Sequence, residues 1–186
     1  MRVLRKAAER IRGASYAFLK KLFNARKFRG AKRLVIGRGA EIRIARGSAV
    51  CLGRGVHVGK DALVSALKGG VITVGDGASV GAGNFIVCHE EITIGKNTIL
   101  APGVMIYDHD HLYSPEAGVD KRKFKTAPVE IGDNCWICAN AVILRGTKIG
   151  NNCVVGAGAV IKGEYPDGSV IIQKRETVVK ELKNEL

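Results

Sequence analysis

A six-residue repeat runs through most of the 186-residue chain and constrains its fold more than any other feature. Each block opens on an aliphatic residue, as at Ile94, Ile131 and Ile149, and the fifth place of the block is usually small. The fourth place is glycine or asparagine at Gly77, Gly83, Asn97, Gly103, Asn134, Asn140, Gly146, Asn152 and Gly158. Both residue types tolerate positive φ, so the pattern predicts a left-handed corner every six residues.

Three short strands joined by such corners make one triangular coil of about 18 residues, and stacked coils bury the aliphatic first places. The repeat therefore pairs Ile131 with Ile149. The corresponding interval between Val74 and Ile94 is longer by two residues, which predicts a bulge near residues 87–93. Earlier residues of the repeat region fit the pattern loosely, and their phase stays open.

These blocks resemble those of the hexapeptide-repeat acyltransferases, a family whose fold is a left-handed parallel β-helix. The resemblance covers roughly residues 36–166. It predicts an all-β solenoid over residues 34–169, preceded by an amphipathic arm at 1–33. A closing segment at 170–186 would end in a short helix.

The repeat is interrupted after Ile106. The fourth places that follow hold His109 and Pro115, and proline cannot adopt the positive φ of a corner. The pattern resumes at Ile131, so an insertion leaves the solenoid near residue 107 and returns near 128. The segment 107–128 is polar, charged and broken by proline and glycine, which predicts a loop. A long loop on a rigid scaffold usually carries a function.

The insertion begins within the sequence IYDHDHLYSP, residues 106–115. The chain resembles the sugar O-acetyltransferases of the galactoside and maltose type, which carry a catalytic histidine on a loop after an I-G-x-N-x-x-x-A-P block. An ungapped count from that block places this histidine at His111. The resemblance implies that His111 is the general base, with His109 as its rival. Asp108 or Asp110 would orient the imidazole or hold the acceptor. An imidazole suits proton removal from a hydroxyl because its ordinary pKa is near neutrality.

The resemblance also implies a homotrimer with acetyl-CoA bound in the groove between solenoids, and no metal. The residues that match donor-binding positions of the family are Trp136, Ala139, Ala157 and Lys162. Asn84 matches an acceptor-binding position. The family's G-x-P-A segment is absent, and VIIQKRET stands at residues 170–177 instead.

The formal net charge of +13 belongs mainly to the N-terminal arm. Residues 1–33 carry twelve Lys/Arg and one Glu, whereas residues 34–186 carry eighteen Lys/Arg and sixteen acidic residues. Within residues 1–23 the apolar positions recur every three or four residues, which predicts an amphipathic helix with a basic face. Two interpretations are open for residues 1–30: contact with an anionic membrane near a lipid-linked glycan, or packing on the body or a neighbouring subunit. Nothing in the sequence indicates a nucleic-acid module.

The chain has no apolar run of about 18 residues and no signal-peptide pattern, which predicts a cytoplasmic protein. Membrane association through the N-terminal helix stays open as one of the two interpretations of that arm. Its five cysteines are then expected to be free thiols. Cys135 and Cys138 form a C-x-x-C, but their places in the repeat favour packing over zinc binding.

The favoured function is acetyl-CoA-dependent O-acetylation of a sugar in surface polysaccharide or lipid-linked glycan assembly. Three alternatives stay open. One is N-acetylation of an amino sugar or an antibiotic. Another is a γ-type carbonic anhydrase, which would need His89, His109 and His111 around zinc. The third is a non-catalytic β-helix scaffold that binds no acetyl-CoA.

Overall fold

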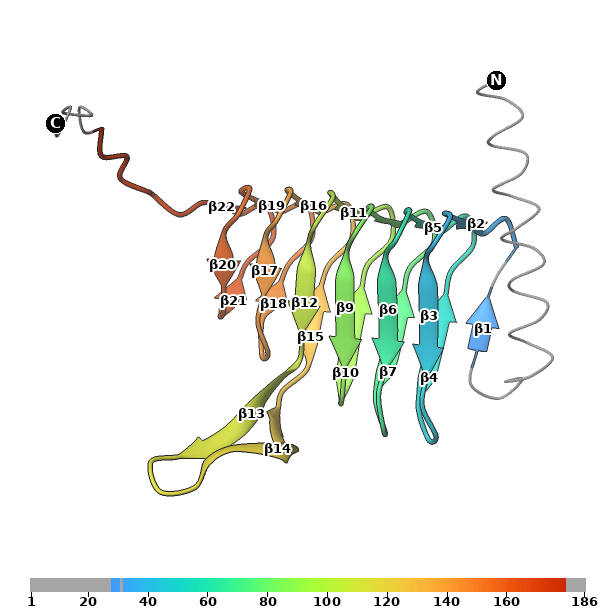
Figure 1. Ribbon diagram of the computed structural model, residues 1–186. Coiled ribbons are helices and arrows are strands. Elements are labelled where there is room, and N and C mark those ends of the chain that lie inside the picture. The colour runs from blue at the N-terminus through green and yellow to red at the C-terminus, as the bar shows by residue number, and fades with distance from the viewer. Residues whose placement is uncertain (1–27, 31, 180–186) are drawn as a thin grey trace, which may run out of the picture.

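The computed structural model describes residues 28–30 and 32–179, and its strands form a three-sided prism from which one hairpin projects (Figure 1). Three parallel sheets run along the prism, one on each side. The predicted all-β parallel β-helix is confirmed. The residues described include no helix, and hence none with the length and hydropathy to span a bilayer.

Each coil of the prism contributes one strand to each sheet, and we name the sheets A, B and C. Sheet A contains, in order, β1 (Phe28–Gly30), β4 (Ala49–Leu52), β7 (Val71–Val74), β10 (Glu91–Ile94), β15 (Val129–Ile131), β18 (Lys148–Ile149) and β21 (Glu164–Tyr165). Sheet B contains β2 (Val35–Ile36), β5 (His57–Val58), β8 (Ser79–Val80), β11 (Ile99–Leu100), β16 (Trp136–Ile137), β19 (Val154–Val155) and β22 (Val170–Ile171). Sheet C contains β3 (Glu41–Ile44), β6 (Leu63–Ala66), β9 (Phe85–Cys88), β12 (Met105–Tyr107), β17 (Val142–Ile143) and β20 (Val160–Ile161).

Strand pairing follows the predicted register. Ile131 pairs with Ile149, and Val74 pairs with Ile94. The two extra residues of that coil form a bend at His89 and Glu90, between β9 and β10. The prediction of a bulge near residues 87–93 is therefore confirmed.

The coils shorten along the prism, as the spacing between paired residues shows. In sheet B, Val58 pairs with Val80, and Val80 pairs with Leu100 across a smaller interval of sequence. After the inserted hairpin the interval is smaller again, as in the pairing of Ile131 with Ile149. The pairing of Ile149 with Tyr165 spans the smallest of these intervals. The N-terminal coils are therefore longer than the C-terminal ones.

All nine predicted corner residues have positive φ, from 54° at Asn97 to 75° at Gly146. Asp61 makes an equivalent corner in the N-terminal coils, with φ of 55°. These corners turn the chain so that aliphatic side chains stack inside the prism. Ile86, Ile106 and similar residues have no exposed surface. Burying each such side chain stabilises the fold by about 1.5–3 kcal/mol.

The prism extends beyond the predicted limits of residues 34–169. β1 pairs with β4 at one end of the prism, and β22 pairs with β19 at the other. Each added strand satisfies backbone groups at the edge of its sheet. The helix predicted within residues 1–23 lies outside the described residues. Of the predicted C-terminal helix, residues 174–179 have no regular secondary structure, and residues 180–186 lie outside the described part.

Candidate active site

The insertion forms a β-hairpin where the sequence predicts an irregular loop. β13 (His109–Ser114) and β14 (Gly118–Thr126) pair antiparallel, and the hairpin leaves the prism between β12 and β15 (Figure 1). Gly118 has φ of 68° at the turn. The polar composition that suggested a loop concerns side chains only. The backbone groups that face the partner strand pair across the ribbon and the outer ones face solvent, which permits a projecting ribbon of polar residues.

Three imidazoles and one phenyl ring gather near the base of the hairpin. His109 and His111 share one face of β13, as their spacing predicts. Both contact Phe124 of β14, with ring centroids 5.4 Å and 4.6 Å away. His89, from the bend in the coil beneath, has its centroid 4.1 Å from that of Phe124 and 4.2 Å from that of His109. The cluster therefore joins the hairpin to the prism.

Asp108 anchors this cluster from inside the prism, where its side chain has no exposed surface. The carboxylate accepts the backbone N–H of His89 at 2.9 and 3.0 Å and that of Glu90 at 2.7 Å. Its Oδ1 atom lies 3.1 Å from Nδ1 of His109. Burial alone would raise the pKa of Asp108, but the hydrogen bonds from His109, Glu90 and His89 outweigh it, and the pKa is lowered. The group is therefore held as a carboxylate.

The two hairpin histidines have their ring nitrogens arranged in the same way. A carboxylate and a carbonyl only accept hydrogen bonds. His109 therefore donates from Nδ1 to Asp108, and His111 donates from Nδ1 to the carbonyl oxygen of Asp120 at 3.1 Å. In the neutral ring, Nε2 is then left as a proton acceptor in each case. The side chain of His109 is only 12% exposed, whereas His111 is exposed.

His89 completes the cluster as a neutral ring. Its pKa is lowered by burial and by the charge of His109, against the opposing effect of Asp108. From the sequence, His89 was considered only as a possible zinc ligand. Within residues 28–30 and 32–179, no group of three or more His, Cys, Asp or Glu side chains is arranged to hold a metal ion.

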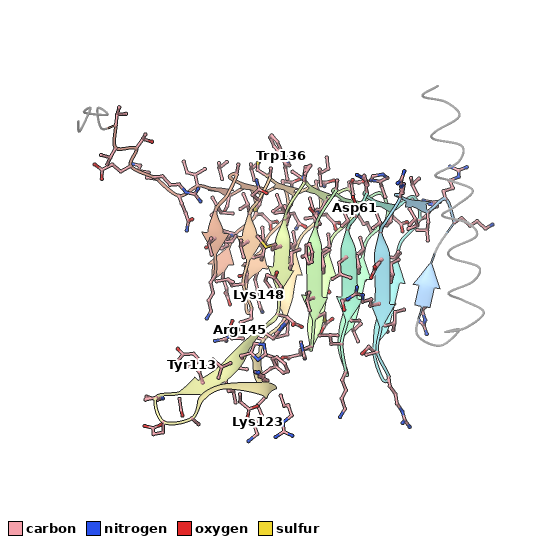
Figure 2. The ribbon with its side chains drawn as sticks, in the orientation of Figure 1. Asp61, Tyr113, Lys123, Trp136, Arg145 and Lys148 are labelled. Atoms are coloured by element: carbon pink, nitrogen blue, oxygen red, sulfur yellow. The ribbon has the colours of Figure 1, made fainter. Side chains whose placement is uncertain are left out.

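Asp110 pairs with a residue that was not predicted from the sequence. Its carboxylate forms an ion pair with Nε of Arg145, on the turn that follows β17. Figure 2 places Arg145 where the hairpin meets the prism. The Arg145 side chain is 14% exposed and that of Asp110 is 49% exposed, so part of the carboxylate stays accessible to a ligand.

The predicted donor-binding residues lie on the last coils, and all but Lys162 lie away from the corner that bears the hairpin. Trp136 is 52% exposed on sheet B and projects from that side in Figure 2. Ala139 and Ala157 are brought together on adjacent coils, where the amide of Gly158 donates to the Ala139 carbonyl at 2.8 Å. They lie at the corner between sheets B and C. Lys162 is exposed at the corner between sheets C and A, which is also the corner that bears the hairpin.

Asn84 does not face the hairpin surface. It occupies the small fifth place of its block and has no exposed surface. Its Oδ1 atom accepts the Val104 N–H at 2.9 Å, and its Nδ2 atom has no partner among the described residues. The side chain is therefore not accessible in the single chain, and its contact with an acceptor stays a prediction.

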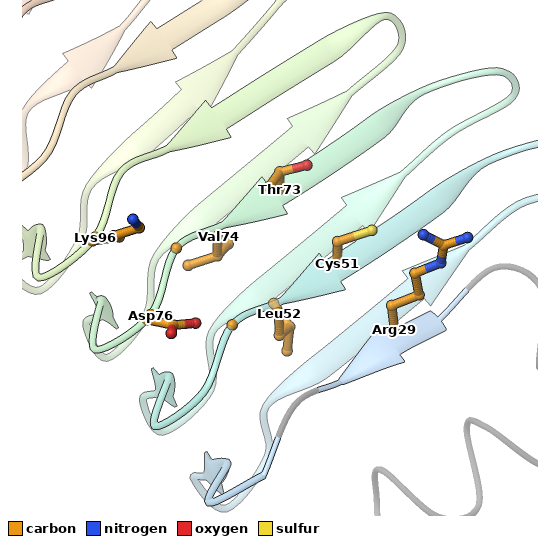
Figure 3. A pocket seen from close by; sticks show the side chains of 9 residues that line it. Arg29, Cys51, Leu52, Thr73, Val74, Asp76 and Lys96 are labelled. Atoms are coloured by element: carbon orange, nitrogen blue, oxygen red, sulfur yellow. The ribbon is translucent and has the colours of Figure 1, made fainter.

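The grooves of the single chain do not identify the site. One groove of about 480 Å³ lies over the N-terminal coils of sheet A (Figure 3). Its lining includes Arg29, Cys51, Thr73, Asp76 and Lys96. None of the residues predicted for catalysis or binding contributes to it, so the candidate site rests on the hairpin cluster.

Comparisons with known proteins support the assignment of the six-residue repeat. The family model described as "Bacterial transferase hexapeptide (six repeats)" matches residues 128–163. Among curated relatives, WbbJ of Escherichia coli (strain K12), named for lipopolysaccharide biosynthesis as an O-acetyl transferase, is 31% identical over 62% of this chain and 63% of its own. Rv3034c of Mycobacterium tuberculosis, named as an acetyltransferase, is 34% identical over 78% of this chain and 49% of its own. The chain thus spans less than two thirds of each relative's length.

Solved structures show the same fold. AntD, an N-acyltransferase from Bacillus cereus solved with dTDP and 3-hydroxybutyryl-CoA, superposes with a TM-score of 0.64 at 19% identity, covering 80% of each chain. A maltose O-acetyltransferase from Clostridium difficile 630 superposes with a TM-score of 0.50 at 22% identity, covering 87% of this chain and 79% of that one. The chain therefore carries the bacterial transferase hexapeptide repeat on a parallel β-helix, as the pattern of its sequence indicates.

Proposed function

We propose that the protein is an acetyl-CoA-dependent O-acetyltransferase that acts on a sugar hydroxyl, with His111 as general base. The observation that carries this proposal is an exposed imidazole on a hairpin of a hexapeptide prism, with Nδ1 tethered to the Asp120 carbonyl. The tether fixes the ring and leaves Nε2 free to take a proton. The names of WbbJ and Rv3034c support acetyl transfer, and that of WbbJ supports a glycan acceptor.

The proposed reaction is a direct transfer within a ternary complex. Nε2 of His111 removes the proton of the acceptor hydroxyl while its oxygen attacks the thioester carbonyl of acetyl-CoA. The tetrahedral intermediate collapses, the C–S bond breaks, and the proton passes from the imidazolium to the leaving thiolate. The products are the acetylated sugar and CoA thiol. His109, oriented by Asp108, is the rival base and otherwise keeps the cluster in place.

The outward faces of the prism support a homotrimer. Sheet C carries an apolar row in register across its coils, consisting of Leu63, Phe85, Met105, Val142 and Val160. Sheet B carries a second row, consisting of Ile99, Trp136, Val154 and Val170. Sheet A presents charged side chains instead, including Glu130 and Lys148. Packing of the B face of one subunit near the C face of the next would bring Trp136 toward the neighbour's hairpin, and acetyl-CoA would bind between the two subunits.

Thiol release from acetyl-CoA, measured against a panel of sugars and amino sugars, tests the proposal. We expect His111→Ala to lower kcat by about 10²–10⁴-fold, the usual contribution of a general base. The control His57→Ala changes an imidazole on β5 whose Nδ1 lies 3.4 Å from the Ser79 hydroxyl, away from the hairpin. Its kcat should stay at the wild-type value.

The other outcomes separate the alternatives. Full turnover by His111→Ala with a dead His109→Ala would assign the base to His109. Turnover only with amino sugars would replace O-acetylation by N-acetylation. Absence of thiol release with every acceptor, from protein that unfolds cooperatively, would reject the enzymatic proposal.

A further inference from the structure

The hairpin contains a cationic bulge beside the proposed base. His111 pairs with Phe124, but the next residue, Leu112, pairs with Asp120. The three residues between these partners on β14 are Lys121, Arg122 and Lys123, and they have no place in the ladder. All three are exposed. The strand pairing thus leaves three consecutive cations outside the ladder, next to the His111–Phe124 pair.

Asp120 shapes this bulge and orients the base at the same time. Its carboxylate accepts the backbone N–H of Arg122 at 2.8 Å and that of Lys123 at 3.2 Å. The hydrogen bond from the Arg122 amide is the main reason that the pKa of Asp120 is lowered. Its carbonyl accepts Nδ1 of His111. The conformation of the bulge is therefore coupled to the position of the imidazole.

One carboxylate lies beside the bulge, that of Asp120, and the charge of Lys123 contributes to lowering its pKa. In the described part of the chain, no carboxylate lies within ion-pair distance of the side chains of Lys121, Arg122 or Lys123. The carboxylates of Asp108 and Asp110 have other partners, His109 and Arg145 respectively. Further exposed cations lie on the turns that join sheet C to sheet A in other coils, namely Arg46, Lys68 and Lys162. The same corner also carries exposed carboxylates at Glu90 and Glu91, so the bulge is distinguished by its three consecutive cations and not by the charge of the whole corner.

We propose that the bulge of Lys121, Arg122 and Lys123 binds the phosphate or carboxylate group of an anionic sugar acceptor. Several adjacent cations bind an oxyanion more strongly than isolated surface charges, and arginine can bind it in a bidentate manner. This inference rests on the proposed function, because it identifies the anion with the molecule whose hydroxyl reaches His111.

The position of the bulge assigns it to the acceptor and not to coenzyme A. The base must contact the acceptor hydroxyl, so an anionic group on the same sugar lies within a few bonds of His111. Coenzyme A also brings its thioester to this place, but its phosphates are separated from the thioester by the whole pantetheine arm.

The test uses the full chain and three sugars that differ in charge: glucose, glucuronic acid and glucose 1-phosphate. Binding is followed by ligand-observed NMR titration, and transfer is followed by thiol release. The charge variant is the triple substitution K121Q/R122Q/K123Q. The matched control, R38Q/K60Q/K96Q, removes three exposed cations from turns at the other two corners of the prism.

We expect the two anionic sugars to bind wild-type protein about tenfold more tightly than glucose, with a difference that shrinks as salt is raised. The bulge variant should lose this difference, and the control should keep it. The KM for acetyl-CoA should be unchanged in both. Asp120→Ala gives a second test, because it makes the hairpin more positive while releasing the bulge. A fixed site predicts weaker binding of glucose 1-phosphate, whereas charge alone predicts tighter binding.

Several results would overturn the inference. One is equal weakening of anionic-sugar binding in the control variant. The others are a raised KM for acetyl-CoA in the bulge variant and tighter binding of glucose 1-phosphate by Asp120→Ala. If the bulge variant lost binding to vesicles of anionic phospholipid while its sugar binding stayed unchanged, the bulge would be assigned to a membrane surface. The inference would then also be rejected. Bulge-dependent binding of glucose 1-phosphate without thiol release for any acceptor would uphold the anion site and reject the proposed enzyme.

Discussion

Oδ1 of Asp108 lies 3.1 Å from Nδ1 of His109, and the same carboxylate accepts the backbone amides of His89 and Glu90. A single buried group thus fixes the first residue of the hairpin to the bend of the preceding coil. The cluster of His89, His109, His111 and Phe124 is built around this attachment.

Replacing Asp108 with Asn should destabilise the protein. The amide nitrogen of Asn cannot accept the backbone N–H that Oδ2 now receives, so a buried donor would be left unpaired at a cost of about 1–3 kcal/mol. Denaturant unfolding measures the change. Asp76→Asn is the control, because its carboxylate is half exposed and accepts the amide of Arg54 at an open corner. An unchanged midpoint for Asp108→Asn would show that the buried network does not stabilise the fold.

Stability should fall as pH drops below the ordinary pKa of histidine, 6.5, because of His89. Its pKa in the folded protein is lower than in the unfolded chain, so the unfolded state takes up a proton first. The stabilisation is complete above pH 6.5 and is lost as pH falls toward the folded value. His89→Gln should flatten the decrease of Tm between about pH 8 and pH 5. Parallel curves for wild type and His89→Gln would contradict this assignment.

Arg145→Gln should loosen the hairpin without unfolding the prism. The ion pair with Asp110 connects the hairpin to the turn after β17, and the Arg145 side chain is mostly buried. We expect faster amide hydrogen exchange across β13 and β14 and unchanged exchange in sheet A. Lys148→Gln breaks an ion pair with Glu130 in which both side chains are 54% exposed. Such pairs contribute about 0–1 kcal/mol, so this control should exchange like wild type.

The corner at Asn152 offers a test of the repeat. With φ of 57° it lies in the left-handed region, which glycine occupies freely and alanine occupies at a cost of about 1–2 kcal/mol. Asn152→Gly should therefore unfold near the wild-type midpoint, and Asn152→Ala should be less stable by roughly that amount. Equal midpoints for the two variants would mean that the corner does not require positive φ.

Phe85→Asp should dissociate the proposed trimer. Phe85 is 44% exposed in the chain and stands between Leu63 and Met105 in the apolar row of sheet C. A buried carboxylate without a partner would strongly oppose assembly. Size-exclusion chromatography with light scattering should give a trimer for wild type and a monomer for the variant. Thr93→Asp, on the charged face of sheet A, should leave the trimer intact.

Much of the prism could be predicted because its corners need a particular backbone conformation. Gly and Asn at every sixth residue identified nine corners, and each has positive φ. The N-terminal coils were harder to place because they are longer than the later ones, as the pairing of Val58 with Val80 shows, and because Asp61 serves as one of the corners. Aspartate is common in many surface positions, so it does not mark a left-handed turn by itself.

The site was predicted less completely, since its contacts join residues far apart in the sequence. The shared face of His109 and His111 follows from strand geometry. The partners Arg145 and His89 do not, because their positions depend on which corner bears the insertion. Asn84 is a buried residue of the repeat, and the acceptor-binding role that its match to a family position suggested stays a prediction.

The graded coil lengths have a consequence for how the chain finds its register. A spiral of identical rungs could slide by one full turn and still match every inward side chain, since each rung would fit its neighbour's neighbour equally well. Apart from the coil that bears the hairpin, each successive triangle here is smaller than or equal to the one before it. The wide pairing of Val58 with Val80 marks one end of the series, and the narrow pairing of Ile149 with Tyr165 marks the other. A coil shifted by one turn would be longer or shorter than the coil it packs on, and its corners would not align. The change in coil length along the prism therefore opposes such a shift.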